Sequence, residues 1–297
     1  MRAPWHLLAC LVISSFSRFI PFTRYRSLIA SCIDSIVFAG LANSVVMKPI
    51  SVISALFLLI LSSCVSSPAT SPIPYQFYAN GSGPAEELVI FLPGRGDDLD
   101  AFEQAGFVER LFESDRAADA VAVRAHLGYY KGGLVAERIY HDILQPFQQK
   151  GYQRFTIVGT SLGGYGALWL NSEYPDLVTG MVLMAPYLGR KPLIKAIEGS
   201  GDVSLWRSQL GNEPGPDQPA ELAWCWIDDL DNNPAGKIDR VILAFGEEDK
   251  FSRAGELLAR SIPESRVFRT DGGHNWAAWY QLWSEITADE EWATLWK

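Results

Sequence analysis

Three residue types that work together in acyl transfer occur in the chain as Ser161, Asp249 and His274. A serine hydroxyl becomes an effective nucleophile when a histidine accepts its proton and a carboxylate orients that histidine. Ser161 lies in the segment G-T-S-L-G, Asp249 ends the turn G-E-E-D, and His274 lies in the glycine-rich segment D-G-G-H-N. The types and contexts of these residues predict chemistry at a carbonyl carbon.

The segment at residues 159–163 has the pattern G-x-S-x-G, which is weak evidence alone because glycine and serine are common. Its setting is informative, since the apolar run F-T-I-V precedes it directly and a run rich in alanine, leucine and glycine follows it. A strand, a sharp turn and a helix in this order form a nucleophile elbow, where side chains at the two glycines would collide. The first amides of the following helix would then face negative charge that develops beside Ser161.

With these motifs the chain resembles the α/β-hydrolase superfamily over most of residues 86–297, because nucleophile, acid and histidine follow in that family's order. The resemblance implies that Ser161 is the nucleophile, His274 the general base and Asp249 the acid that orients the histidine. Glu248 is the reserve choice for the acid. The resemblance implies no metal and no organic cofactor.

The same resemblance implies two amide donors for the oxyanion. One is the amide of Leu162, directly after the nucleophile, and the other lies in the loop after an early strand. Here that loop reads P-G-R-G-D-D at residues 93–98, which departs from the His-Gly forms common in the family, and Arg95 is the predicted second donor. The predicted lining of the substrate pocket, for which packing is the alternative role of the aromatic members, is Gly94, His126, Tyr129 and Tyr130.

From about residue 75 short apolar runs alternate with longer amphipathic ones, which predicts an α/β fold with a mostly parallel sheet and helices on both faces. Helices are predicted at 135–149 and 162–171. The stretch 187–236 is rich in proline, glycine and tryptophan and is the candidate for a small cap inserted between two strands, with a plain surface excursion as the alternative. Strands are predicted at residues 87–92, 120–124, 155–159, 180–184, 241–245 and 265–269.

Four aromatic residues near the C-terminus have helical spacing, which is more typical of a core-facing stripe than of a ligand site. We therefore predict that these residues pack in the core. They are Trp276, Trp279, Tyr280 and Trp283.

The N-terminal region has the order of a signal peptide, because Met47 is followed by one lysine, an apolar run at 50–61 and small residues that end at Cys64. The apolar run is shorter than the roughly 20 residues of a membrane-spanning helix. The segment L-S-S-C that ends at Cys64 resembles the lipobox of bacterial lipoproteins. This resemblance implies lipidation of Cys64 and attachment to a membrane of the bacterial cell envelope, on the periplasmic or outer-membrane side; an ordinary buried or membrane helix is the alternative.

The expected domain organisation follows from these segments. Residues 47–63 are the signal peptide, 64–74 the lipidated cysteine with a Ser/Pro tether, and 75–297 the catalytic domain. Residues 1–46 are an apolar extension, and we expect that translation starts at Met47 instead.

The charge of the chain argues against nucleic acid as a partner. The whole chain has 25 basic and 34 acidic residues. Residues 1–63 hold five basic residues and one acidic residue, so 20 basic and 33 acidic residues remain in the rest of the chain. Such a domain repels phosphate backbones, and no basic stripe interrupted by aromatic residues is evident. Of the four cysteines only Cys225 lies in the catalytic part, where flanking tryptophans predict a buried, unreactive thiol.

The resemblance implies hydrolysis of a small-molecule carboxylic ester through an acyl-enzyme. Lipid esters or thioesters become attractive substrates if Cys64 anchors the domain at a membrane. An acyltransferase or a peptidase would use the same three residues, and a lipoprotein that keeps the scaffold only to bind a ligand is a rival from another class.

Overall fold

The computed structural model describes residues 67–81, 85–233, 237–289 and 292. The predicted signal peptide, the extension before it and the lipidation site Cys64 lie outside these residues and stay predictions. Within the ranges given, no helix is both long enough and apolar enough to cross a bilayer.

A seven-stranded sheet lies at the centre of the described chain, in the spatial order β1-β3-β2-β4-β5-β6-β7. All neighbouring strands are parallel except β1 and β3. Every residue of β2, β3 and β6 is buried, as expected for strands that helices cover on both faces. The predicted fold class is confirmed. The strands are β1 (Tyr75–Tyr78), β2 (Glu87–Leu92), β3 (Ala118–Val123), β4 (Arg154–Thr160), β5 (Val178–Met184), β6 (Val241–Gly246) and β7 (Val267–Thr270).

Each predicted strand overlaps an observed one, and the range 87–92 coincides with β2. Strand β1 is not among the predicted strands. It has only four residues, the first three of which are exposed, so it shows no apolar run. Its extended conformation comes from antiparallel pairing with β3 at the edge of the sheet, which the local sequence does not encode.

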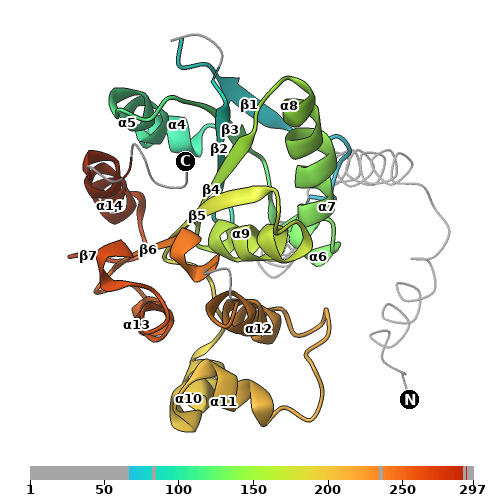
Figure 1. Ribbon diagram of the computed structural model, residues 1–297, viewed down its shortest axis with the longest axis vertical. Coiled ribbons are helices and arrows are strands. Elements are labelled where there is room, and N and C mark those ends of the chain that lie inside the picture. The colour runs from blue at the N-terminus through green and yellow to red at the C-terminus, as the bar shows by residue number, and fades with distance from the viewer. Residues whose placement is uncertain (1–66, 82–84, 234–236, 290–291, 293–297) are drawn as a thin grey trace, which may run out of the picture. The chain divides into compact units, whose positions relative to one another are not determined.

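Helices cover both faces of the sheet (Figure 1), with α5 and α14 on one side and α7, α8 and α9 on the other. The predicted helix at 135–149 is observed as α7 and α8 joined by the π-helical turn η2. The helices before β5 are α4 (Ala101–Gln104), α5 (Phe107–Glu113), α6 (Leu127–Lys131), α7 (Val135–Ile139), η2 (Tyr140–Leu144), α8 (Gln145–Gln149) and α9 (Leu162–Glu173). Those after it are α10 (Lys191–Ser200), α11 (Val203–Ser208), α12 (Pro219–Asp231), η3 (Lys237–Arg240), α13 (Ser252–Ala259), η4 (Glu264–Arg266) and α14 (Trp276–Ala288).

The stretch that interrupts the strand rhythm forms α10, α11 and α12 between β5 and β6. Helix α12 packs on α9, because Trp226 stacks against Tyr165 with ring centroids 5.8 Å apart. Trp224 is fully buried, and its indole N–H donates to the carbonyl of Leu188 at 2.8 Å. This insertion is therefore anchored to the body of the domain by large aromatic side chains.

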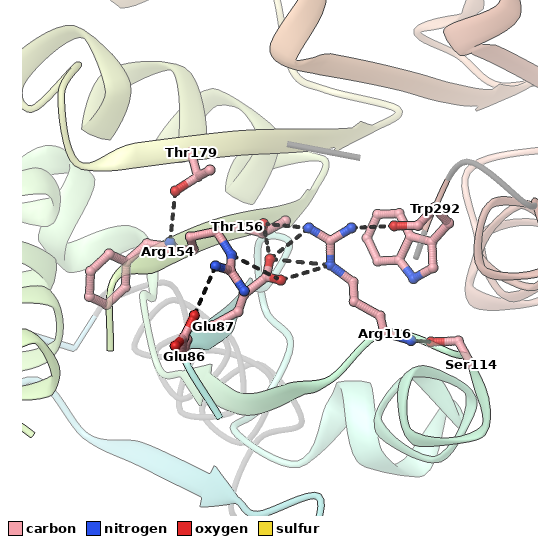
Figure 2. Close-up of polar contacts among 9 residues, drawn as sticks. Glu86, Glu87, Ser114, Arg116, Arg154, Thr156, Thr179 and Trp292 are labelled. Carbon is pink, nitrogen blue, oxygen red and sulfur yellow. Dashed lines mark hydrogen bonds and ion pairs between the residues drawn. The ribbon is translucent and has the colours of Figure 1, made fainter. Parts of the chain in front are cut away.

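A buried ion pair fastens the amino-terminal end of the sheet (Figure 2). Glu87, the first residue of β2, and Arg116 are each 1% exposed, and an Arg116 nitrogen lies 2.7 Å from a Glu87 oxygen. Thr156 of β4 donates a further hydrogen bond of 2.6 Å to Glu87. Arg116 also donates to the carbonyl of Trp292 and lies 4.3 Å from the centroid of its ring. These contacts supply the partners without which a buried charge is strongly unfavourable.

The aromatic stripe of α14 is only partly a core feature. Trp279 and Trp283 are buried, and Trp283 stacks on Phe107 at 5.5 Å while its indole N–H donates to the Phe107 carbonyl at 2.9 Å. The prediction that all four residues pack in the core is wrong for Tyr280, which is 41% exposed, whereas Trp276 is half-buried and packs against the core. At about 100° per residue the four positions form a stripe about 100° wide on the helix, and Tyr280 lies at the edge of that stripe.

Candidate active site

Ser161 occupies the tight turn between β4 and α9. Its backbone dihedrals are φ 51° and ψ −110°, a strained conformation for a residue with a side chain. A Cβ atom on Gly159 would collide with the carbonyl of Gly163, and one on Gly163 would collide with the carbonyl of Leu92. The predicted reason for the two glycines is thus confirmed, because the turn leaves no space for side chains beside the serine.

The structure brings the three predicted residues together at the carboxyl edge of the sheet. Ser161 follows β4, Asp249 follows β6, and His274 follows β7. The His274 Nε2 atom lies 2.9 Å from the Ser161 hydroxyl oxygen, and its Nδ1 atom lies 2.8 Å from a carboxylate oxygen of Asp249. Both distances are those of hydrogen bonds.

The carboxylate of Asp249 is held in place by its own loop. Its side chain is fully buried, and its second oxygen accepts a hydrogen bond of 2.7 Å from the amide of Phe251. The reserve residue Glu248 is exposed, so its side chain does not share this position. A buried acceptor on Nδ1 favours the tautomer that leaves Nε2 free to accept the serine proton.

Two aromatic rings flank the imidazole of His274. The rings of Phe251 and Trp279 each lie 4.9 Å from it, at interplanar angles of 82° and 87°. Edge-to-face contacts of this kind limit the rotation of the histidine ring. Trp279 therefore belongs to the site as well as to the core.

A cavity of about 960 Å³ opens above Ser161 and His274. Its walls combine aromatic, aliphatic and basic side chains. Gly94, a predicted lining residue, lies on this wall, and a Cβ atom there would lie 3.5 Å from the Cβ of Ser161. The remaining residues of the wall are Arg95, Asp97, Leu127, Lys131, Leu162, Tyr187, Arg190, Lys250, Phe251, Asn275, Trp276 and Trp279.

The other three predicted pocket residues do not line this cavity, and the prediction for them is wrong. Tyr129 is fully buried, with its hydroxyl bonded to Thr70. Tyr130 is buried with its hydroxyl against Gly166, and burial raises its pKa far above the usual value. His126 is the N-cap of α6, where its Nδ1 accepts from the amide two residues later. Packing, the alternative role, holds the two tyrosines away from the cavity, and helix capping holds His126.

Several wall residues were missed by sequence reasoning. Leu127 and Lys131 are the first and last residues of the helix that carries the two tyrosines, and both line the cavity. Tyr187 and Arg190 follow β5, and their place after the carboxyl end of a parallel strand is a signal that could have found them. Lys250 directly follows Asp249.

The two residues predicted as oxyanion donors lie on the wall of this cavity. Leu162 is the first residue of α9, whose first amides have no partner within the helix. Arg95 lies in the turn beside Gly94, whose Cβ position would be 3.5 Å from the Cβ of Ser161. Their function as donors stays a prediction.

No group of three metal-ligating side chains occurs among the residues that the structure describes. Cys225 is 2% exposed, and burial raises the pKa of its thiol to about 12. The prediction of a buried, unreactive thiol at this position agrees with both observations.

A comparison with protein families finds that the Esterase model, described as "Putative esterase", matches residues 130–289. A curated relative, the uncharacterized protein YjcH of Bacillus subtilis (strain 168), is 25% identical over 157 residues. This alignment covers 52% of the present chain and 56% of YjcH, so it spans little more than half of that relative.

Solved structures with a similar fold include an esterase from Pyrobaculum calidifontis, at a TM-score of 0.53 and 17% identity, with 81% of this chain and 89% of that chain covered. A ferulic acid esterase superposes with a TM-score of 0.51 and 15% identity, covering 75% of this chain and 95% of the other. At these identities the comparison establishes the α/β-hydrolase fold.

Proposed function

The chain belongs to the Esterase family, and from this premise we propose that it hydrolyses carboxylic esters through an acyl-enzyme intermediate on Ser161. The observation that carries the proposal is the unbroken hydrogen-bonded series Ser161, His274, Asp249, with distances of 2.9 and 2.8 Å. A base on the hydroxyl group, oriented by a carboxylate, is the arrangement that makes a serine nucleophilic.

In the first half of the reaction the Ser161 oxygen attacks the ester carbonyl carbon while its proton moves to Nε2 of His274. Asp249 stabilises the imidazolium that forms, without taking the proton itself. The tetrahedral intermediate collapses when His274 returns the proton to the departing alkoxide. An alcohol leaves, and the acyl group stays on Ser161 as an ester.

The second half releases the acid. A water molecule enters the place of the alcohol and gives a proton to His274 as it attacks the acyl-enzyme carbonyl. Collapse of the second intermediate breaks the bond to Ser161, which takes the proton back. The free serine and a carboxylic acid result, and no metal or organic cofactor takes part.

The main-chain amides of Leu162 and Arg95 are proposed to bind the oxyanion in both halves. Support comes from their position on the wall of the cavity that contains Ser161. The positive end of the α9 dipole also points at this place, because the helix begins at Leu162. Backbone donors of this kind typically stabilise the transition state by about 3 kcal/mol each.

The substrate is proposed to be a small-molecule ester. The cavity volume of about 960 Å³ falls in the range of about 300 to 1,000 Å³ that is typical of small-molecule sites. The proposal includes esters or thioesters of lipids, because the expected lipid anchor at Cys64 would hold the catalytic domain close to membrane lipids.

The deciding experiment combines covalent labelling with a substrate panel. A fluorophosphonate probe and 4-nitrophenyl esters of increasing acyl length are applied to the wild-type chain, to Ser161→Ala and to Ser208→Ala. Ser208 is an exposed serine of α11 and serves as the matched control. The proposal requires that labelling and hydrolysis disappear in Ser161→Ala and persist in Ser208→Ala. Wild-type protein that is folded but neither labels nor turns over any ester is instead a binding protein.

A further inference from the structure

The basic side chains of the catalytic cavity point to a substrate class. We propose that the ester hydrolysed at this site carries an anionic group, such as a carboxylate, phosphate or sulfate, at a distance from its scissile bond. This inference rests on the proposed function, because it concerns the same cavity.

Four basic side chains line the cavity, against a single carboxylate on its wall, that of Asp97. The four are exposed, so they stand at the mouth of the cavity rather than in its interior. They come from four different segments, which meet only in the folded chain. These residues, the cationic rim, are Arg95 in the loop after β2, Lys131 at the end of α6, Arg190 before α10 and Lys250 after Asp249.

The cationic rim contradicts the charge of the domain. After residue 63 the chain has 20 basic and 33 acidic residues, so a surface region chosen at random would hold more carboxylates than cations. The rim reverses this ratio at the cavity that contains Ser161 and His274. The positive potential of the rim attracts anionic molecules into the cavity, whereas it does not attract neutral ones.

The cations of the rim are also free to bind a ligand. Among the described residues, no ion pair involves any member of the rim, and Lys250 alone has a further contact, 4.9 Å above the ring of Phe251. Many arginines elsewhere are engaged with carboxylates, as Arg138 is with Asp142 at 3.2 Å and Arg269 with Glu256 at 2.8 Å. Cations without a local partner at a cavity mouth are available to an anionic ligand.

The interior of the cavity is complementary to the rest of such a molecule. Tyr187, Phe251, Trp276 and Trp279 supply aromatic surface around Ser161. Arg190 is the N-cap of α10, so the positive end of that ten-residue helix adds to the field at the mouth. The arrangement fits an ester whose apolar or aromatic part lies against these rings while its anionic group stays at the rim.

Two pairs of esters test the proposal, each differing in one charge. The first pair is 4-nitrophenyl hydrogen adipate and its methyl ester, with the charge on the acyl side. The second pair is 4-acetoxybenzoate and its methyl ester, with the charge on the leaving group. Each kcat/KM is divided by the rate constant for hydroxide hydrolysis of the same ester, so that intrinsic reactivity cancels.

The anionic member of at least one pair is expected to be preferred about tenfold or more at low ionic strength, as for other sites with focused charge. The preference is expected to shrink severalfold at about 0.5 M salt, where the Debye length is only a few Å. A preference for the neutral member in both pairs would overturn the proposal.

Single substitutions locate the effect. Lys131→Gln and Arg190→Gln are expected to lower the preference for the anionic ester severalfold each. The matched control is Arg240→Gln, an exposed arginine that directly precedes β6 at the opposite edge of the sheet, which is expected to leave the preference unchanged. If all three variants lower the preference equally, net charge and not the rim is responsible, and the proposal fails.

A binding measurement separates this inference from the proposed function. Calorimetry on Ser161→Ala compares the affinities of 4-hydroxybenzoate and methyl 4-hydroxybenzoate, which need no turnover. Tighter binding of the carboxylate, weakened by Arg190→Gln, supports the rim even if no ester is hydrolysed. Equal or weaker binding of the carboxylate, together with a preference for the neutral member of the adipate pair, overturns the inference and leaves ester hydrolysis intact.

Discussion

The amide of Glu248 donates a hydrogen bond of 3.1 Å to the carbonyl of Gly272, and this bond joins the loop that carries Asp249 to the loop that carries His274. The two loops pack backbone against backbone here, since a Cβ atom on Gly246 would collide with the same Gly272 carbonyl. The relative position of the acid and the base therefore depends on the absence of a side chain at Gly246.

Gly246→Ala is predicted to separate these loops. The added methyl group pushes Gly272 away, so kcat/KM should fall by about a hundredfold, the effect of roughly 1 Å of misplacement in an active site. Gly199→Ala is the control, because its Cβ atom has open space in α10 and should raise the free energy of unfolding by up to about 1 kcal/mol. Ester hydrolysis and denaturant unfolding of both variants measure the two effects; unaltered hydrolysis by Gly246→Ala contradicts the argument.

Asp249→Asn tests the orientation of His274. An amide in this buried position favours the wrong imidazole tautomer, so kcat should drop by about 10⁴. Glu248→Gln, one residue earlier and exposed, should change kcat less than about twofold, since a surface substitution has little effect. Equal losses in the two variants would mean that the acid has been assigned wrongly.

The buried pair of Arg116 and Glu87 is predicted to be critical for stability. Arg116→Met leaves the Glu87 carboxylate with only the more distant Arg154, at 4.0 Å, and should cost about 3 to 5 kcal/mol of unfolding free energy. Arg124→Met removes an exposed ion pair with Asp98 and should cost less than about 1 kcal/mol. Chemical denaturation of both variants measures the two losses of unfolding free energy. Similar denaturation midpoints for the two variants would show that the buried pair contributes little to stability.

Stability is predicted to fall in mild acid because of His126. Burial, aided by the nearby charge of Arg124, lowers the pKa of this histidine below its usual 6.5. The unfolded chain therefore binds the proton more readily, so this contribution to stability is complete above pH 6.5 and is lost as the pH falls through the lowered pKa. His126→Asn keeps a side chain that caps helices well but does not titrate. Unfolding free energies of both proteins between about pH 5 and 8 should show a smaller decrease for the variant, and identical decreases would rule out His126 as the cause.

Tyr130→Phe distinguishes packing from substrate contact. The Tyr130 hydroxyl is buried without a hydrogen-bond partner among the described residues, so its removal should leave stability unchanged or raise it by about 1 kcal/mol. Hydrolysis should stay at the wild-type rate for every ester of the panel. A change in KM for some esters only would place Tyr130 in the pocket after all.

The sequence predicts the sheet because strands β2 and β6 contain apolar runs. An apolar run is the local sequence pattern of a strand that helices cover on both faces. It predicts the nucleophile turn because Gly159 is required by a local contact with Gly163, although Gly163 itself is required by the carbonyl of Leu92, which is distant in the chain. It does not predict which side of α6 meets the cavity. The orientation of that short helix depends on the hydrogen bond between Tyr129 and Thr70, two residues that are far apart in the chain.

The buried pair at the other edge of the sheet is equally hidden from the sequence. Glu87 opens an apolar run and reads as the solvated end of a strand, yet it is almost completely buried. Its burial depends on Arg116 and on Trp292, which the chain supplies 29 and 205 residues later. No window of local sequence contains that information.

The bond from Arg116 to the carbonyl of Trp292 has a practical consequence for handling the protein. It holds the end of the described chain at the amino edge of the sheet, whereas Ser161 opens on the carboxyl edge. A solid support or a fusion partner attached after Trp292 would thus be joined to the protein at the edge of the sheet opposite the active site. If the protein were immobilised in this way, the cavity that contains Ser161 would stay open to the substrate solution.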